Sequence, residues 1–236
     1  MSNSKKNNDE QTHAHDAAVP RKLRSEDRLK QLGAPADSSL PPLPEELTLL
    51  RSADLIAGRA MCLCLCASKA EGLEPEIARE LLVDFNIGDN LTAAERAYLE
   101  SDDPVEPETA RLFQWGYEAC WVLLWVLGYV QELPDPIATC DPERIAAFMT
   151  RHPSVEALSS GAVIRQGESI LDAADFNRRV FQLCVRSGPP YQQVPGGFLA
   201  AVAYQREHAF QWLLTHKEAG WDEIVIDIGS NTDNTY

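Results

Sequence analysis

A carboxylate in the middle of a long apolar stretch is the first feature of this sequence that could do chemistry. Between Leu112 and Val130 nearly every residue is apolar or small, yet Glu118 stands within the stretch. A carboxylate among such neighbours must be ion-paired, hydrogen-bonded or held in its protonated form, because burying an unpaired charge is costly. Glu118 therefore needs a partner from another segment, and it is a candidate catalytic acid or base.

Two arginines have the placement that such a partner requires. When each predicted helix is projected at about 100° per residue, Arg59 and Arg206 fall among apolar residues and away from the charged side. We expect a buried polar cluster of Arg59, Glu118 and Arg206, in which Glu118 pairs with Arg206, Arg59 or both. The alternative is that the long arginine stems cross apolar surface and the guanidinium groups reach water. Either arginine is also a candidate for binding an anionic group.

A second group of charges lies on the segment from Glu168 to Ser187. These charges fall within about 60° of one another on a helical projection, and they are Asp172, Asp175, Arg179 and Arg186. The simplest interpretation is a solvated helix face with ion pairs between residues four apart. If the stripe instead lines a cleft, Asp172 and Asp175 could share general acid and base roles or bind a divalent cation, as weak metal candidates.

Other patterns that could carry chemistry point to structure. Cys62, Cys64 and Cys66 resemble a metal signature, but on a helix only Cys62 and Cys66 share a face, and no second ligand pair exists. We interpret them as buried thiols and His208 as structural. The sequence contains no glycine-rich phosphate loop and no GxSxG or HExxH motif. We therefore expect no metal and no cofactor.

The elements that would position these residues are predicted to be helices. From Pro44 onward apolar residues recur with helical spacing, and proline and glycine fall mostly at segment edges. We predict about seven helices, over residues 45–68, 75–86, 92–101, 107–130, 142–150, 168–187 and 197–217. Only residues 221–228, WDEIVIDI, resemble a strand. The predicted fold is all-α, or mainly α: a multi-helix bundle around the central apolar helix, with one short C-terminal strand-like segment.

Composition limits the possible classes of function. The chain has 236 residues, of which 44% are hydrophobic, and its formal net charge is −15. Residues 1–36 are polar and are predicted to be a disordered tail with a short helix, so residues 37–236 form a single helical domain. That domain contains 14 basic and 31 acidic residues, a net charge of −17. Such a charge repels phosphate backbones and anionic lipids, so we expect neither nucleic acid nor a membrane as partner.

The same features favour one function and leave a second open. The start lacks a secretory signal and the longest apolar run is too short to cross a bilayer, so we expect a cytoplasmic protein with reduced cysteines. Its acidity favours a non-enzymatic interaction protein that engages a basic protein partner. The alternative is a carboxylate-dependent hydrolase or a divalent-cation-binding protein. Either would use Asp172 and Asp175 with Glu118 and Arg206. Asp222 and Asp227 are further carboxylate candidates for the hydrolase.

Several sequence blocks, in the same order, resemble domain of unknown function 4272, a family found mainly in bacteria. The blocks are LPEELTLLRSADLIAGRA, WGYEACWVLLWVLG, ILDAADFNRR, QREHAFQWLL and WDEIVID, within residues 43–227. The resemblance implies that the family pattern falls on Arg59, Trp115, Glu118, Asp172, Asp175, Arg206, Trp212, Trp221, Asp222 and Asp227. Gln205 and Ile228 depart from the glutamate and threonine that the family tends to have. The family carries no established activity, so the resemblance implies no reaction.

Overall fold

The computed structural model describes residues 18–49, 51–102, 106–188, 193–214 and 219–226, and none of these residues forms a strand. The fold is therefore all-α, as predicted. Residues 18–31 are helical, and we call them the first helix. The elements that follow are α2 (Ala53–Ala70), α3 (Pro75–Asp84), η1 (Gly88–Asn90), α4 (Ala93–Glu100), α5 (Pro107–Gln114), α6 (Gly116–Val126), α7 (Pro142–Arg151), α8 (Val155–Ser160), α9 (Gly167–Ser187), η2 (Pro195–Gly197), α10 (Ala200–Leu214) and η3 (Trp221–Glu223).

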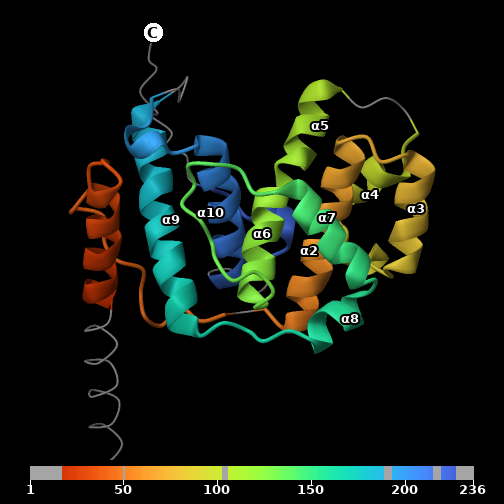
Figure 1. Ribbon diagram of the computed structural model, residues 1–236, viewed down its shortest axis with the longest axis horizontal. Helices are drawn as coiled ribbons and strands as arrows, with labels where there is room; N and C mark the ends of the chain where they lie inside the picture. The colour runs from red at the N-terminus through yellow and green to blue at the C-terminus, as the bar shows by residue number, and fades with distance from the viewer. Residues whose placement is uncertain (1–17, 50, 103–105, 189–192, 215–218, 227–236) are drawn as a thin grey trace, which may run out of the picture.

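The helices are arranged so that the two ends of the molecule are built from different parts of the chain. The first helix lies at one end of the long axis, beside α9, and α3 and α4 lie at the other end (Figure 1). Between them, α2 packs against α5, α6 and α8, while α10 packs against α6 and α9. Every residue of α6 is buried, so this helix is the centre of the core.

Local capping chemistry explains where several helices begin. The side chain of Ser52 accepts a backbone N–H bond at the start of α2. Thr92 and Glu95 form a reciprocal capping box at the start of α4. Asp141 caps α7, whose first residue is Pro142. These contacts satisfy N–H groups that the first turn of a helix would otherwise leave without acceptors.

The apolar stretch that we predicted as one central helix is divided at Trp115. α5 ends just before this residue and α6 begins just after it. The Trp115 carbonyl accepts a hydrogen bond from the N–H of Glu118, three residues later, so the backbone tightens here. Of these two helices, α6 is fully buried among other helices, whereas Leu112 on α5 is 65% exposed. No helix in the described ranges is both long and apolar enough to span a membrane.

The predicted strand over residues 221–228 is wrong. Its described part forms the single turn η3 and then an irregular stretch to residue 226, and residues 227–228 lie outside the described ranges. In this turn the side chain of Glu223 accepts a hydrogen bond from the N–H of Gly220 at 2.7 Å. A strand also needs a neighbouring strand to bond with, and the described part of the chain offers none.

Two further segments differ from the prediction. Residues 45–52 are not helical where they are described, and α2 begins only at Ala53. Arg51 in this segment donates hydrogen bonds to the backbone carbonyls of Trp212 and Ala219, which hold the chain away from a helical path. The short helix α8 was not predicted, because its six residues are too few to show a helical period.

Candidate functional site

Glu118 is ion-paired within the core. Its Oε2 atom lies 3.1 Å from Nη2 and 3.3 Å from Nε of Arg206 on α10, and both side chains are buried. Its Oε1 atom accepts a hydrogen bond from the backbone N–H of Cys140. Arg206 also donates to the carbonyl of Pro134. The carboxylate therefore joins α6 to α10 and to the loop that precedes α7.

Arg59 does not contact this pair, so the three-residue cluster that we expected is wrong in that member. The guanidinium of Arg59 pairs with Glu95 on α4, and both side chains are buried. It also donates to the carbonyl of Asn90 at 3.3 Å. Glu95 is the carboxylate of the α4 capping box, which brings it to the face of α2 that carries Arg59. Arg59 and Arg206 thus belong to two separate buried ion pairs.

The charged stripe on α9 is covered by the N-terminal part of the chain. Asp175 is 0% exposed. Its Oδ2 atom lies 2.8 Å from Nε of Arg179, and its Oδ1 atom accepts a hydrogen bond from the backbone N–H of Leu43 at 3.1 Å. Asp172 binds Arg21 at 3.2 Å and Arg24 at 2.7 Å, both on the first helix. The pair between Asp175 and Arg179 does join residues four apart, but the interpretation as a solvated helix face is wrong for these two residues, which are buried. Asp172 and Arg186, at the two ends of the stripe, are partly exposed.

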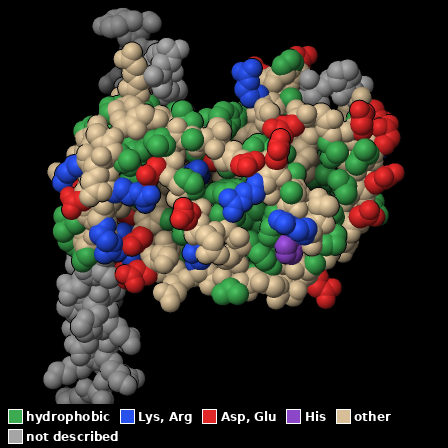
Figure 2. All heavy atoms as spheres, in the orientation of Figure 1, with side chains coloured by type: hydrophobic (Ala, Val, Ile, Leu, Met, Phe, Trp, Pro, Cys, Tyr) green, Lys and Arg blue, Asp and Glu red, His purple; other side chains and the backbone are tan. Residues whose placement is uncertain are grey.

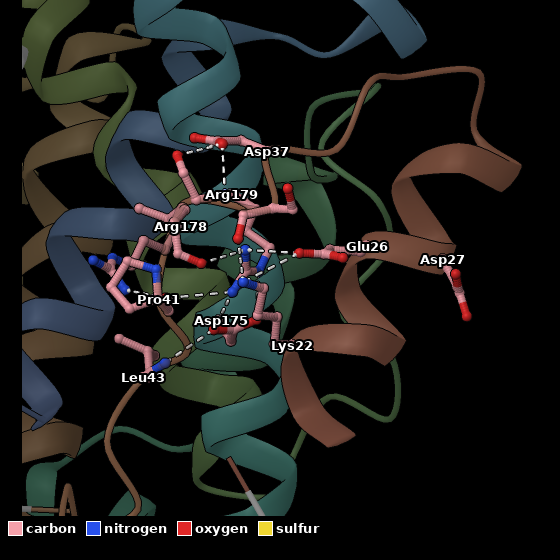
Figure 3. A network of polar contacts seen from close by, with 12 residues as sticks. Lys22, Glu26, Asp27, Asp37, Pro41, Leu43, Asp175, Arg178 and Arg179 are labelled. Atoms are coloured by element: carbon pink, nitrogen blue, oxygen red, sulfur yellow. Dashed lines mark hydrogen bonds and ion pairs between the residues drawn. The ribbon is translucent and has the colours of Figure 1, made fainter. Parts of the chain in front are cut away.

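Figure 3 shows how the N-terminal segment and α9 share this network of polar contacts. We call residues 18–44 the N-terminal strap, because the first helix and the segment after it both lie on α9. Its other contacts with α9 are Glu26 with Arg179 at 3.8 Å, Asp37 with Arg186, and the carbonyls of Leu40 and Pro41 with Arg179 and Arg178 at 3.2 and 3.1 Å. Residues 18–36, which we assigned to the tail, are therefore packed on the helical domain, and residues 1–17 lie outside the described ranges.

The candidate residues do not meet around one cavity. Glu118 lines a cavity of about 330 Å³ beside Cys140. Asp172 lines a separate groove of about 920 Å³ along the first helix. Arg59 lines a third cavity, of about 400 Å³. Asp175 is fully buried under the N-terminal strap. A reaction that needed these carboxylates together has no common site in this arrangement.

The cysteines have the environment of core thiols. Cys62, Cys64 and Cys66 are free and buried. Burial raises the pKa of the Cys62 and Cys64 thiols to about 12, so the thiolate that would bind metal or act as nucleophile is scarce at neutral pH. Within the described residues, no three side chains of His, Cys, Asp or Glu are placed to hold a metal ion, and this includes Asp172 and Asp175.

A further cavity, which we call the Trp221 pocket, has a volume of about 250 Å³ and lies among α4, α5, α10 and η3. The rings of His208 and Trp221 line it with their centroids 4.4 Å apart. Burial lowers the pKa of His208 to about 4, so its ring is neutral at neutral pH. The Nδ1 atom of this ring is buried and has no hydrogen-bond partner among the described residues. The exposed Asp222 carboxylate also lines the pocket.

Charge is distributed unevenly between the two ends of the molecule. Residues 71–108, which we call the acidic end, contain 12 acidic and 2 basic residues, a net charge of −10. Figure 2 shows acidic side chains gathered at this end, over α3 and α4. Its exposed carboxylates are Glu71, Glu74, Glu76, Glu80, Asp84, Asp89, Glu100, Asp102, Glu106 and Glu108. The first helix, at the opposite end, contains 5 basic and 2 acidic residues.

Comparison with known protein families identifies the relatives of this chain. The pattern of the family described as domain of unknown function (DUF4272) matches residues 21–224. The chain belongs to this family. The resemblance drawn from the sequence blocks is therefore confirmed. The DUF4272 match begins at Arg21, so it includes residues 21–31 of the first helix. Comparisons with curated proteins and with solved structures found no match.

The positions that the DUF4272 resemblance implied fall at different places in the structure. Trp115 lines the cavity of Glu118, and the rings of Trp212 and Trp221 are in edge contact at 5.5 Å. Asp222 lines the Trp221 pocket, and Asp227 lies outside the described residues. Sequence reasoning gave His208 a structural role. The spacing of Tyr204 and His208, four residues apart on one helix face, is the signal that could have drawn attention to this pocket.

Proposed function

We propose that this protein is a non-enzymatic binding protein whose acidic end engages a basic protein partner in the cytoplasm. The observation that carries the proposal is the segregation of charge, since the acidic end holds a net charge of −10 out of −15. Opposite charges on two surfaces speed their encounter and disfavour wrongly charged partners. The same field repels nucleic acids, so a lysine- and arginine-rich protein is the partner of matching charge.

The exposed face of α3 has the composition that a protein partner would need. Val83 is 76% exposed and Ile77 is 44% exposed, and both lie among the carboxylates of Glu76, Glu80 and Asp84. Apolar side chains within a charged rim provide contact area that is removed from water on binding, while the rim sets the choice of partner. We therefore place the centre of the interface on α3.

A carboxylate-dependent hydrolase or a divalent-cation-binding protein receives less support. Those alternatives combine Asp172 and Asp175 with Glu118 and Arg206, and these side chains are ion-paired in two places with no shared cavity. A carboxylate held by an arginine is a poor proton acceptor or cation ligand until that contact is broken. The cytoplasmic assignment is supported by six cysteines that are all free.

The test removes three charges from the acidic end without removing volume. In the triple variant Glu76→Gln, Glu80→Gln and Asp84→Asn we expect the affinity for a basic partner to fall about tenfold, at roughly 0.5 kcal/mol per exposed charge. Partners are captured from lysate at low and at moderate salt, identified, purified and measured by calorimetry. Captured proteins should be rich in lysine and arginine and should be lost as salt rises.

A matched control removes the same number of charges elsewhere. The triple variant Glu132→Gln, Glu143→Gln and Glu156→Gln alters exposed carboxylates outside the acidic end, and it should bind the partner as the wild type does. If both triple variants lose the partner equally, the charge effect is general and the acidic end is not the interface. If no captured protein shows both salt dependence and dependence on α3, the proposed function is wrong.

A further inference from the structure

The Trp221 pocket is lined by carboxylates and aromatic rings and by no lysine or arginine. Its carboxylates are those of Glu95 and Asp222, and its rings are those of Phe113, Tyr204, His208 and Trp221. Glu95 is already paired with Arg59, whereas no described lysine or arginine pairs with Asp222. The carboxylate that is left to act on a bound molecule is therefore that of Asp222.

We propose that the Trp221 pocket binds the cationic head group of a lysine or arginine side chain, supplied by the basic partner. The identity of the occupant rests on the proposed function, because that function is what brings a basic protein to this part of the surface. Aromatic faces attract organic cations within about 6 Å of the ring, and a nearby carboxylate adds to that attraction. The pocket thus presents two groups of side chains that both favour the same ligand charge.

The unpartnered nitrogen of His208 is consistent with a donor on the ligand. A neutral imidazole has one acceptor nitrogen, and in the tautomer protonated at Nε2 that acceptor is Nδ1. Most buried polar atoms in folded proteins have a hydrogen-bond partner, so Nδ1 is a candidate acceptor for a donor on the ligand. An ammonium or guanidinium group carries several N–H donors, which can bond to Asp222 and, once the His208 ring turns to expose Nδ1, to that atom as well.

The remaining walls and the position of the pocket suit a long basic side chain. Leu63 and Leu112 give the pocket an apolar wall, against which the methylene stem of lysine or arginine can lie. Thr92, Ala94 and Glu95 of the acidic end form another wall. A partner drawn to the acidic end would therefore meet the opening of the pocket at the edge of the same surface.

Arg51 and Arg59 are the described cations to be weighed against this assignment, because both line the neighbouring cavity, to which Trp221 and Asp222 also contribute. Arg51 donates to the backbone carbonyls of Trp212 and Ala219. The guanidinium of Arg59 lies 5.2 Å from the centroid of the Trp221 ring, but Arg59 lines the neighbouring cavity and not the Trp221 pocket. Its charge is balanced by Glu95. Within the described residues neither arginine is ion-paired with Asp222, so this carboxylate can contact a cation in the Trp221 pocket.

The test uses the full chain and small probes that carry only the proposed head group. Nα-acetyl-lysine amide and Nα-acetyl-arginine amide are titrated while the Trp221 indole N–H and the His208 ring protons are followed by NMR. We expect saturable shifts of these signals with at least one cationic probe and none with Nα-acetyl-norleucine amide, which has a similar length and no charge. Equal shifts with the neutral probe, or no shift with either cation, would overturn the proposal.

Variants then separate the pocket from the general negative charge. Asp222→Asn should weaken binding of the cationic probe about tenfold, while Glu156→Gln, which removes an exposed charge on α8, should leave it unchanged. Gln205→Lys, which introduces a cation into the pocket lining, should abolish binding and serves as an independent variant if Asp222→Asn is unstable. Wild-type affinity in Asp222→Asn and Gln205→Lys would overturn the proposal.

The outcome is distinguishable from failure of the proposed function. Suppose that the cationic probes bind in a way that depends on Asp222, but that no basic partner is found. This result supports the cation site and contradicts the proposed function. The converse result is a basic partner whose binding depends on α3 but is equally tight to Asp222→Asn and to the wild type. This result supports the proposed function, and it overturns the proposal that a side chain of the partner binds in the Trp221 pocket.

Discussion

Glu118 and Arg206 bind each other, and both also form hydrogen bonds with the backbone of the loop that connects α6 to α7. The carboxylate accepts from the N–H of Cys140, and the guanidinium donates to the carbonyl of Pro134. These backbone contacts make the pair more than a local ion pair, because removing either member leaves both a buried charge and an unpaired loop group. The pair fixes three distant segments of the chain relative to one another.

This arrangement makes the stability of the fold sensitive to Glu118. Glu118→Ala should lower the free energy of unfolding by about 3–5 kcal/mol, because it leaves Arg206 buried without its partner. Urea denaturation checks the change, and Glu132→Ala is the control, since Glu132 is exposed. The double variant Glu118→Ala and Arg206→Ala should cost less than the sum of the two single variants. A melting curve of Glu118→Ala close to that of the wild type would contradict this interpretation.

His208 makes stability depend on pH in a defined window. Burial lowers its folded pKa to about 4 from the ordinary value of 6.5, while Asp222 opposes this shift and Arg59 adds to it. The unfolded chain therefore binds the proton more readily, so stability is full above pH 6.5 and is lost as pH falls toward 4. From pH 7 to 5 the loss from this group is about 1–2 kcal/mol.

The measurement for His208 is a difference between two proteins. Urea denaturation of the wild type and of His208→Gln is compared at pH 7 and pH 5, so that carboxylates common to both proteins cancel. We expect the wild type to lose more stability than His208→Gln over this interval. The same loss in both proteins would show that His208 is not buried as the neutral imidazole.

At the scale of elements, the first helix is held on α9 by buried residues as well as by ion pairs. Leu29 is 1% exposed, and Arg21, on the same helix, is equally buried between Asp172 and Glu45. Leu23 lies on the opposite side and is 53% exposed. The helix therefore has one face that contributes to the core and one that contacts solvent.

The two leucines of this helix form a matched pair for a stability test. Leu29→Ala should lower the free energy of unfolding by about 2–5 kcal/mol, because it leaves a cavity in the core. Leu23→Ala should change it by less than about 0.5 kcal/mol, since the side chain is exposed. Denaturation in urea measures both. Equal effects would mean that the first helix is not part of the cooperative unit.

The sequence predicted the helices where a cap or proline and a clear period coincide. α3, α4, α7 and α9 begin or end within a few residues of the predicted bounds. It failed where tertiary contacts override local preference. Trp115 interrupts an unbroken apolar run, and Arg51 is held by carbonyls of Trp212 and Ala219, which are more than 150 residues away in the sequence. Such contacts are not visible in a local pattern.

The candidate site was predictable only in part, for a related reason. Apolar surroundings indicated that Glu118, Arg59 and Arg206 need partners, and periodicity placed Asp172 and Asp175 on one face. Which partner each charge finds depends on how the helices are packed, and a projection of single helices carries no such information. The Trp221 pocket was missed because part of its wall comes from η3, whose Trp221 ring contacts the rings of His208 and Trp212 on α10.

At the scale of the whole molecule, the fold holds two oppositely charged segments of the chain far apart. The acidic end and the first helix lie at opposite ends of the long axis (Figure 1) and have opposite net charge. A molecule with this asymmetry has a strong permanent dipole, which would orient a charged partner before contact. The effect should be strongest at low salt, where the screening length is longest.

The N-terminal strap also affects how the chain folds during synthesis. Arg21 and its partner Asp172 are 151 residues apart, so the earliest part of the strap to leave the ribosome finds its binding surface only when α9 has emerged. At about 5–20 residues per second, that interval is roughly 8–30 s. During it the apolar face around Leu29 has no cover, and the nascent chain would depend on chaperones to keep that face from aggregating.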